Sequence, residues 1–236
     1  MAKLELKNKD CFNCFQYIPN GSVDLIFTDL PYGVTKNKWD SELNLGQLWV
    51  EYERMIKPNG AIILFAQDKF SAKLMLSNEK LHRYNIIWEK TTPTGHERKV
   101  STAQHKRNSK KTTNYGKHGL TTYDSTERYP KSVWKFATDK QKEAIHPTQK
   151  PIALCEEIVK TYTNVGDCVL DNCMGSGTIP IACLNTKRIC IGFEKEKDIY
   201  QKAIERIKSK FSDLMFSEGE DFLNCFLPIT ENEAGT

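Results

Sequence analysis

The tetrapeptide Asp29-Leu30-Pro31-Tyr32 combines residue types that can polarise an amino group on an aromatic ring. Such a nitrogen is a poor nucleophile because its lone pair is delocalised into the ring. Proline fixes its own φ and favours an extended residue before it, so a carboxylate, a carbonyl and an aromatic ring would project together. Hydrogen bonds from the amino group to Asp29 and the Leu30 carbonyl would aim the lone pair, while Tyr32 stacks on the ring. Taken alone, the motif could also be a turn that caps a strand.

A second loop, Asp171-Asn-Cys-Met-Gly175-Ser-Gly177-Thr178, carries glycines that let the backbone approach a ligand closely. It lies between a predicted strand and a predicted helix, and Glu194 ends the next strand, where an acid can hold ribose hydroxyls. The lysine of a P-loop is missing after Gly177, and Pro180 stands where a dinucleotide site needs a third glycine. A nucleoside without a pyrophosphate fits better, of which S-adenosylmethionine is the commonest. A tight turn without a ligand is the alternative.

Strands and helices alternate along the chain on both sides of a central segment. Short apolar runs predict strands, and an apolar period of 3.6 residues predicts helices. Strands are expected at 22–28, 61–66, 84–88, 168–171, 188–193 and 222–229, helices at 45–56, 69–78, 151–159, 178–185 and 198–211, and a turn at 57–60. This order predicts an α/β fold with a mainly parallel sheet covered on both faces. Because ligands bind at the carboxyl ends of such strands, both motifs should face one crevice.

The charge of the chain is unevenly distributed. The net charge is +4, yet the segment from Lys90 to Lys140 contains 12 Lys/Arg and four Asp/Glu, which leaves −4 for the remainder. Tyrosine, tryptophan and histidine are interspersed with these basic residues. Such a segment suits contact with a phosphate backbone, and a solvated loop without a partner is the alternative.

Composition excludes several classes of protein. A hydrophobic content of 39% with only 13 Gly and 9 Pro excludes collagenous and generally disordered chains. No apolar run approaches a membrane span and the first residues form no signal peptide, so a soluble, cytoplasmic protein without membrane partners is expected. The eight cysteines are expected to be reduced. No metal site is expected, because the Cys11–Cys14 pair lacks a second pair at zinc spacing.

The two motifs together would compose one reaction. A sulfonium methyl donor beside an amino-group clamp would allow methyl transfer to a nucleobase amine. A target base within duplex DNA would have to be flipped out of the stack. The basic segment would then hold the phosphates of the duplex.

These motifs resemble those of the DNA amino-methyltransferases, the S-adenosylmethionine-dependent N6-adenine and N4-cytosine enzymes. Residues 29–32 resemble their (Asp/Asn/Ser)-Pro-Pro-Tyr catalytic motif, and residues 171–178 resemble their Asp-x-Phe-x-Gly-Ser-Gly-Thr cofactor loop. The resemblance implies that Asp29, Leu30, Pro31 and Tyr32 are catalytic. It further implies that the cofactor is bound by Asp10, His146, Pro147, Thr148, Lys150, Asp171, Cys173, Gly175, Ser176, Gly177, Thr178 and Glu194.

The order of the motifs, with the catalytic one first, is similar to that of the β group of this family. This resemblance implies a Rossmann-like methyltransferase fold that is circularly permuted, with a mainly parallel seven-stranded sheet and one antiparallel strand. It implies one domain over residues 1–236 with a basic target-recognition insert at 91–140. Members of this group are often homodimers, so the resemblance makes a homodimer possible here.

Two residues depart from the family pattern. Leu30 replaces a proline that offers only its carbonyl, and Cys173 replaces a phenylalanine that contacts the cofactor. Asp29 favours adenine over cytosine, whose enzymes usually carry serine there. The resemblance thus implies methylation of adenine N6 in double-stranded DNA by base flipping. The alternatives are an N4-cytosine enzyme of the same fold, methylation of RNA or a glutamine side chain, and a DNA-binding relative that has lost catalysis.

Overall fold

The computed structural model describes residues 3–33, 43–91, 132–137 and 149–211. They belong to two compact units, one formed by residues 1–84 and 138–236 and the other by residues 85–137. The first unit contains the elements β1 (Lys3–Lys7), η1 (Cys11–Asn13), η2 (Phe15–Tyr17), β2 (Val23–Thr28), α1 (Leu45–Met55), β3 (Ile56–Leu64), α2 (Asp68–Ser77), α3 (Ile152–Tyr162), β6 (Cys168–Asp171), α4 (Thr178–Asn185), β7 (Ile189–Phe193) and α5 (Lys197–Lys210).

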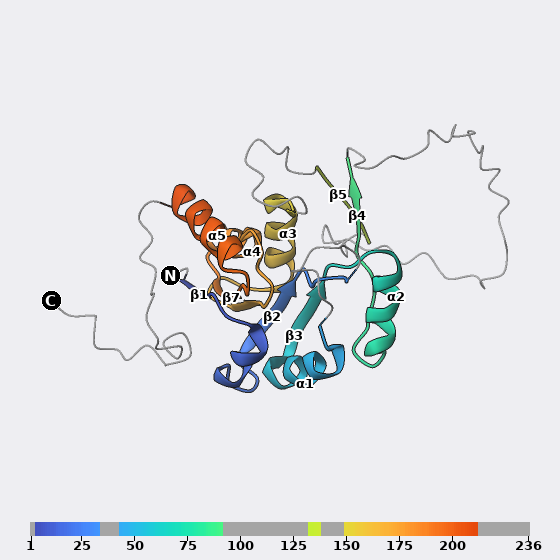
Figure 1. Cartoon of the computed structure of the whole chain (residues 1–236). Coiled ribbons are helices and arrows are strands. Elements are labelled where there is room, and N and C mark those ends of the chain that lie inside the picture. The colour runs from blue at the N-terminus through green and yellow to red at the C-terminus, as the bar shows by residue number, and fades with distance from the viewer. Residues whose placement is uncertain (1–2, 34–42, 92–131, 138–148, 212–236) are drawn as a thin grey trace, which may run out of the picture. The chain divides into compact units, whose positions relative to one another are not determined.

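The strands of the first unit form a five-stranded sheet in the order β1-β7-β6-β2-β3, in which each neighbouring pair is parallel (Figure 1). From β6 the chain continues to β7 on one side, and from β2 it continues to β3 on the other side. The boundary between β6 and β2 is therefore the switch point of the sheet, where ligands bind in open α/β folds. Leu25 lies opposite Val169 and Ile26 opposite Leu170, so the two strands end at the same edge.

Side chains that alternate along the strands fill two apolar layers. Ile26, Leu170 and Ile191 pack in one core cluster with residues of η1, η2, α1 and α2. The intervening residues of the same strands are equally buried and face the side covered by α3 and α4 (Figure 1). Burial on both faces explains why these strands are continuous apolar runs. The predicted α/β fold with a mainly parallel sheet is confirmed.

The predicted turn at 57–60 is wrong. These residues lie within β3, which begins directly after α1. Val23 of β2 pairs with Ile56 and Leu25 pairs with Ala61, so the register shifts and β3 accommodates the extra residues as an irregularity. Gly60 allows the close approach, because a Cβ there would lie 2.8 Å from the Asp24 carbonyl oxygen.

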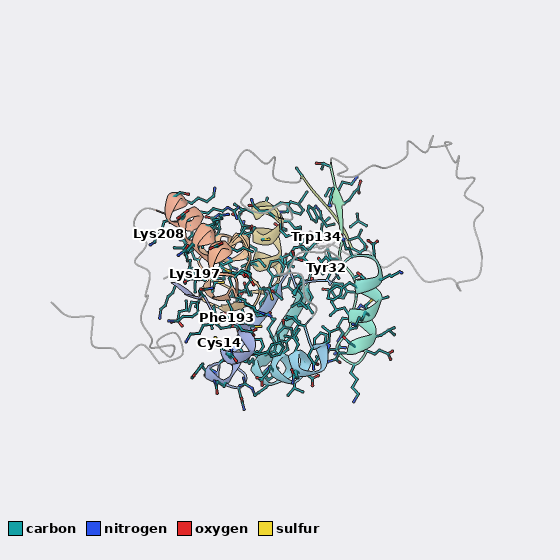
Figure 2. The ribbon with its side chains drawn as sticks, viewed as in Figure 1. Cys14, Tyr32, Trp134, Phe193, Lys197 and Lys208 are labelled. Atoms are coloured by element: carbon teal, nitrogen blue, oxygen red, sulfur yellow. The ribbon has the colours of Figure 1, made fainter. Side chains whose placement is uncertain are left out.

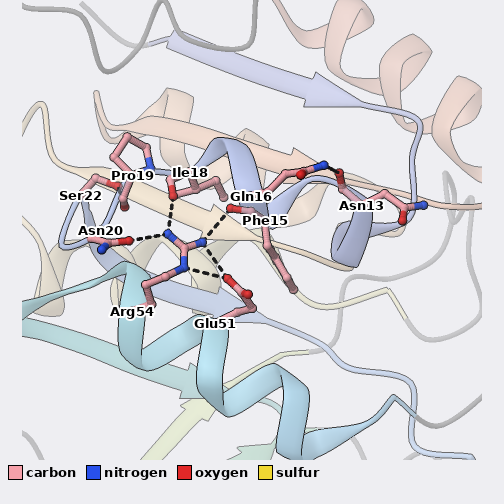
Figure 3. Close-up of polar contacts among 9 residues, drawn as sticks. All are labelled: Asn13, Phe15, Gln16, Ile18, Pro19, Asn20, Ser22, Glu51 and Arg54. Atoms are coloured by element: carbon pink, nitrogen blue, oxygen red, sulfur yellow. Dashed lines mark hydrogen bonds and ion pairs between the residues drawn. The ribbon is translucent and has the colours of Figure 1, made fainter.

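An arginine at the end of α1 fixes the segment that leads into β2 (Figure 3). Arg54 donates to the carbonyl oxygens of Phe15 and Ile18 at 2.8 and 2.7 Å and to Asn20 Oδ1 at 2.8 Å. Its guanidinium also pairs with Glu51 one turn earlier at 2.7 Å. The Phe15 carbonyl also accepts from the Ile18 N–H at 3.0 Å, so Arg54 adds a second donor there and holds the segment before β2 against α1.

The second unit contains β4 (Ile87–Lys90) and β5 (Val133–Phe136), which form a parallel pair with Trp88 opposite Trp134. The strand predicted at 84–88 starts later, because pairing with β5 begins at Ile87, whose N–H donates to the Ser132 carbonyl at 2.7 Å.

Parts of the expected fold lie outside the described residues. These are the terminal strand at 222–229 and most of the insert at 91–140. In the described part of the chain, no helix has both the length and the apolar character that a membrane crossing requires. The seven cysteines that the structure describes are all free thiols.

Candidate active site

Four carboxylates follow four adjacent strands of the sheet. Asp10 comes after β1, Glu194 after β7, Asp171 at the end of β6 and Asp29 directly after β2. Because these strands are parallel and neighbouring, their carboxyl ends lie along one edge. Burial is the main cause of the raised pKa of the Asp171 carboxyl, and the negative charges of Asp29 and Glu194 raise it further. The edge therefore brings together acids that are far apart in the sequence.

Both carboxylate oxygens of Asp29 have partners. Tyr32 donates its hydroxyl to Oδ1 at 2.7 Å, and the Lys150 ammonium forms an ion pair with Oδ2. The side chains are only 26% exposed for Asp29 and 16% for Lys150. The carboxylate is thus held in one orientation at the open end of β2.

Aromatic rings support both partners of Asp29. The Tyr32 ring stacks on Phe70 of α2, with ring centroids 4.8 Å apart and an interplanar angle of 28°. Figure 2 shows Tyr32 beside that helix. The Lys150 ammonium lies over the ring of Phe65, 4.9 Å from its centroid. One face of the Tyr32 ring is therefore used by the protein.

The two residues between Asp29 and Tyr32 differ in burial. Leu30 is 3% exposed and its side chain belongs to the core cluster, whereas Pro31 is half-buried. The buried side chain anchors the turn, so Leu30 can offer a ligand only its backbone. Replacement of a proline by leucine at this position therefore keeps the backbone group available.

The glycine loop after β6 turns sharply into α4. Gly177 has a φ of +73°, and a Cβ there would lie 3.1 Å from Ile207 Cδ1 of α5. Gly175 also has a positive φ, of +50°. The N–H of Gly177 donates to the Met174 carbonyl at 2.9 Å, which closes the turn. A glycine at 177 is thus required both by conformation and by the closeness of α5.

A buried arginine holds this loop from behind. Arg206 of α5 is 7% exposed and donates to the Ser176 carbonyl at 2.9 Å and to Thr178 Oγ1 at 3.0 Å. Ser176 and Thr178, 6% and 5% exposed, face this arginine rather than solvent. The guanidinium fixes the loop while the outer face of α5 carries exposed lysines such as Lys197 and Lys208 (Figure 2).

Asp171 is a buried carboxyl with an unused acceptor. It is 1% exposed, and no described residue forms a hydrogen bond with its Oδ2. Burial raises the pKa of Asp171 to about 8, and the nearby Thr28 hydroxyl and Cys173 N–H offset only part of this shift. With a pKa of about 8, the Asp171 carboxyl is largely protonated at pH 7. A cationic ligand beside it would favour the ionised form.

Glu194 ties the end of β7 to the glycine loop. Its Oε2 accepts from the Gly175 N–H at 3.0 Å and its Oε1 accepts from the Glu196 N–H at 2.8 Å. Burial nevertheless raises the pKa of this carboxyl above its usual value. Each carboxylate oxygen has a further lone pair for a ligand hydroxyl.

Asp10 occupies the outer end of the row. Its Oδ1 accepts from the Phe12 N–H at 3.0 Å and so caps η1. Its Oδ2 lies 3.8 Å from the ammonium of Lys195, an exposed residue. The cap uses only Oδ1, so Oδ2 is the oxygen that a ligand could contact.

Cys173 belongs to a small buried polar cluster. Asn172 donates its amide N–H groups to the thiols of Cys11 and Cys173 at 3.7 and 3.5 Å, and its Oδ1 accepts from the Tyr52 hydroxyl at 2.5 Å. A hydrogen bond from the Cys173 thiol is the main cause of the lowered pKa of Cys11. Cys173 therefore contacts protein groups, where the family pattern has an aromatic residue.

The structure brings most of the sequence-predicted residues to one edge and adds others. The stretch 146–148 lies outside the described residues, and Lys150, expected at the cofactor, contacts Asp29. Sequence reasoning missed Phe70 and Arg206. Phe70 occupies an ordinary apolar position of α2, and Arg206 is one of many charged residues of α5. Neither residue therefore had a local sequence signal that pointed to the site.

Comparison with known proteins identifies the family of the chain. A family model described as DNA methylase matches residues 23–205. The chain is 30% identical over 234 residues to the Type II methyltransferase M.HpaI of Haemophilus parainfluenzae, covering 86% of this chain and 74% of that protein. It is 26% identical to M2.DpnII of Streptococcus pneumoniae, covering 88% of this chain and 91% of that protein.

Solved structures agree with this assignment. The crystal structure of the M1.HpyAVI–SAM complex matches with a TM-score of 0.62 and 27% identity over 86% of this chain and 98% of that one. The PvuII DNA methyltransferase, described as cytosine-N4-specific, matches with a TM-score of 0.58 at 14% identity, which supports the fold alone. The family model covers most of the chain, and the chain therefore belongs to the DNA methylase family of N6 and N4 amino-methyltransferases.

Proposed function

We propose that this DNA methyltransferase transfers a methyl group from S-adenosylmethionine to the N6 amino group of adenine in double-stranded DNA. The observation that carries the proposal is the convergence of Asp29 and the glycine loop at the carboxyl ends of β2 and β6, the adjacent strands at the switch point. This edge is where an open α/β sheet binds its ligand. It can present a base-holding motif and a nucleoside-holding loop to one crevice.

In this proposal, the Asp29 carboxylate and the Leu30 carbonyl accept the two N–H groups of the target amine. Tyr32 stacks on the base with the ring face that Phe70 does not cover, and Pro31 keeps the three groups together. These hydrogen bonds draw the nitrogen towards sp³ geometry and free its lone pair. The methyl group would move from the sulfonium sulfur to the nitrogen, so that the S–C bond breaks as the N–C bond forms. Asp29 then takes the surplus proton of the nitrogen, and its 26% exposure gives that proton a route to solvent.

The residues at the other strand ends fit S-adenosylmethionine. When bound, this cofactor supplies an electrophilic methyl group on a sulfonium centre. Asp171 offers a buried acceptor that lacks a described partner, and the positive φ of Gly175 and Gly177 opens the loop for close approach. Glu194, fixed by two backbone N–H groups, suits ribose hydroxyls. Asp10 is proposed for the adenine side, with Ser176, Thr178 and Cys173 shaping the pocket wall and residues 146–148 completing it.

The proposed methyl acceptor is inferred from Asp29, which bears on the target base, and from the basic segment, which bears on the nucleic acid. An aspartate at this motif position favours adenine, and the N4 of cytosine is the alternative target within the same family. The local charge of +8 between Lys90 and Lys140 supports duplex DNA as the partner, since lysine and arginine neutralise phosphates. A base within a duplex must be flipped to reach the edge described here.

The role of Asp29 is tested by Asp29→Ala. The variant should lose methyl transfer from tritiated S-adenosylmethionine to unmethylated chromosomal DNA, while its cofactor affinity by calorimetry stays near that of the parent protein. The matched control is Asp24→Ala, which removes an ion-paired carboxylate at the other end of β2. Full activity of Asp29→Ala would refute the assigned role.

The target base is identified separately. The DNA methylated by the parent protein is digested to nucleosides and analysed by mass spectrometry. N6-methyl-2′-deoxyadenosine supports the proposal, whereas N4-methyl-2′-deoxycytidine would reassign the substrate without changing the roles of the strand ends. Methylation of neither nucleoside, with cofactor binding intact, would indicate a relative that has lost catalysis.

A further inference from the structure

Lys150 has a different neighbourhood from the one that the sequence implies. Its motif places it with the cofactor, but its ammonium pairs with Asp29 Oδ2 and lies over the Phe65 ring. Lys150 comes just before α3, 121 residues from its partner in sequence. The contact therefore ties the start of α3 to the motif after β2.

The environment makes this contact stronger than an ordinary surface ion pair. Both side chains are largely buried, with exposures of 16% for Lys150 and 26% for Asp29, so water screens the charges less than at a surface. The face of an aromatic ring also attracts an ammonium, which favours the position over Phe65. By comparison, Lys57, which pairs with Asp24 at the other end of β2, is 43% exposed and is therefore more accessible to water than Lys150.

The two partners of Asp29 act on different oxygens. Tyr32 holds Oδ1 and Lys150 holds Oδ2, so rotation of the carboxylate about its last bond would break both contacts. A carboxylate has about four lone-pair sites, so each oxygen keeps one for a further donor. The geometry thus fixes the plane in which Asp29 can accept an N–H group from a base.

We propose that Lys150 is a positioning residue for Asp29, orienting the carboxylate that receives the target amine, and that its main partner is this acid rather than the cofactor. The inference rests on the proposed function of Asp29. Lys150 does not touch the reacting atoms in this proposal. It keeps Asp29 Oδ2 in place and compensates its charge before the base enters.

The test is a set of three variants of the full chain. Lys150→Met removes the charge but keeps the length of the side chain, Lys150→Arg keeps the charge, and Lys57→Met makes the same change at the other end of β2. Turnover is measured at saturating tritiated S-adenosylmethionine and unmethylated chromosomal DNA. Cofactor affinity is measured by calorimetry without DNA, and folding is checked by thermal unfolding.

Displacement of a catalytic group by about 1 Å can cost on the order of 10²-fold in rate, so Lys150→Met should lose turnover by about that factor. Its cofactor affinity should stay near that of the parent protein. Lys150→Arg should recover a substantial part of the turnover, and Lys57→Met should keep it. This split between turnover and affinity is what a merely structural role would not produce.

Two results would overturn the inference. One is a Lys150→Met protein with weakened cofactor binding and unchanged turnover at saturation, which would place the lysine at the cofactor. The other is unchanged turnover and unchanged affinity. If Asp29→Ala is inactive in the same assay, either result refutes only the role of Lys150, whereas an active Asp29→Ala protein refutes the function on which it rests.

Discussion

The raised pKa of Asp171 has a direct consequence for the stability of the protein. The change is Asp171→Asn, which preserves the shape of the side chain but removes its titration. In the folded parent protein the carboxyl is 1% exposed and burial raises its pKa from 3.8 to about 8. In the unfolded chain it ionises at its ordinary value. Between pH 3.8 and about pH 8, the unfolded chain therefore holds fewer protons at this residue than the folded protein does. The parent protein loses stability as the pH rises through this range.

The magnitude follows from the same linkage. One pKa unit corresponds to about 1.4 kcal/mol, so the free energy of unfolding of the parent protein should fall relative to that of Asp171→Asn by up to about 1.4 kcal/mol per pH unit. Between pH 5 and pH 7 this amounts to as much as about 3 kcal/mol. The stabilising contribution of the neutral acid is complete below pH 3.8 and is lost as the pH rises through about 8.

The assay is urea unfolding of both proteins at pH 5, 6, 7 and 8 without cofactor and with a reductant present. The difference between the two unfolding free energies isolates residue 171, because the remaining titrating groups are shared. Asp198→Asn, at an exposed position of α5, removes a surface carboxylate and provides the matched control. A difference between parent and Asp171→Asn that does not change with pH would mean that Asp171 is already ionised in the folded protein, and would refute the reasoning.

Two further changes test other contacts of the site. Tyr32→Phe removes the 2.7 Å hydrogen bond to Asp29 Oδ1 but keeps the ring on Phe70. Turnover should fall about tenfold or more, as expected for the loss of one hydrogen bond to a charged group. Unchanged turnover would exclude a role for the hydroxyl. Gly177→Ala places a Cβ 3.1 Å from Ile207 at a φ of +73°. The strained backbone alone should lower the free energy of unfolding by roughly 1–2 kcal/mol, and the affinity for the cofactor should also fall. Gly166→Ala, at a φ of +88° with no atom within 4 Å of the added Cβ, shares the backbone cost. Equal losses in both variants would show that the contact with α5 contributes nothing.

The sequence predicted the strand ends of the site because two local signals coincide there. The runs that form β2 and β6 are mostly apolar and buried on both faces, as expected for parallel strands. Asp29 directly follows β2, and Asp171 is the last residue of β6. A glycine-rich or proline-containing turn follows each of them. From these signals, Asp29 and Asp171 could be placed at carboxyl ends, and the parallel order of the strands then brings them to one edge.

The contacts between elements could not be predicted in this way. The pairing of Lys150 with Asp29, of Tyr32 with Phe70 and of Arg206 with the glycine loop joins residues that are 28 to 121 positions apart. Periodicity reports whether a residue faces the core, but it does not report which element it meets there. The misplaced turn at 57–60 has a similar cause, since Pro and Gly there serve an irregular part of β3 that only its pairing with β2 defines.

The charges at the carboxyl edge explain why this site suits a cationic methyl donor. Four acids end four adjacent strands, and the described ion pairs at this edge bring only Lys150 to Asp29 and Lys195 to Asp10. Asp171 and Glu194, between those two, have no such partner among the described contacts, and burial raises the pKa of both. A positive ligand beside them would reverse these shifts, because an opposite charge favours the ionised form. In the proposed cofactor site, a sulfonium compound would therefore gain most from the middle of this row, at Asp171 and Glu194.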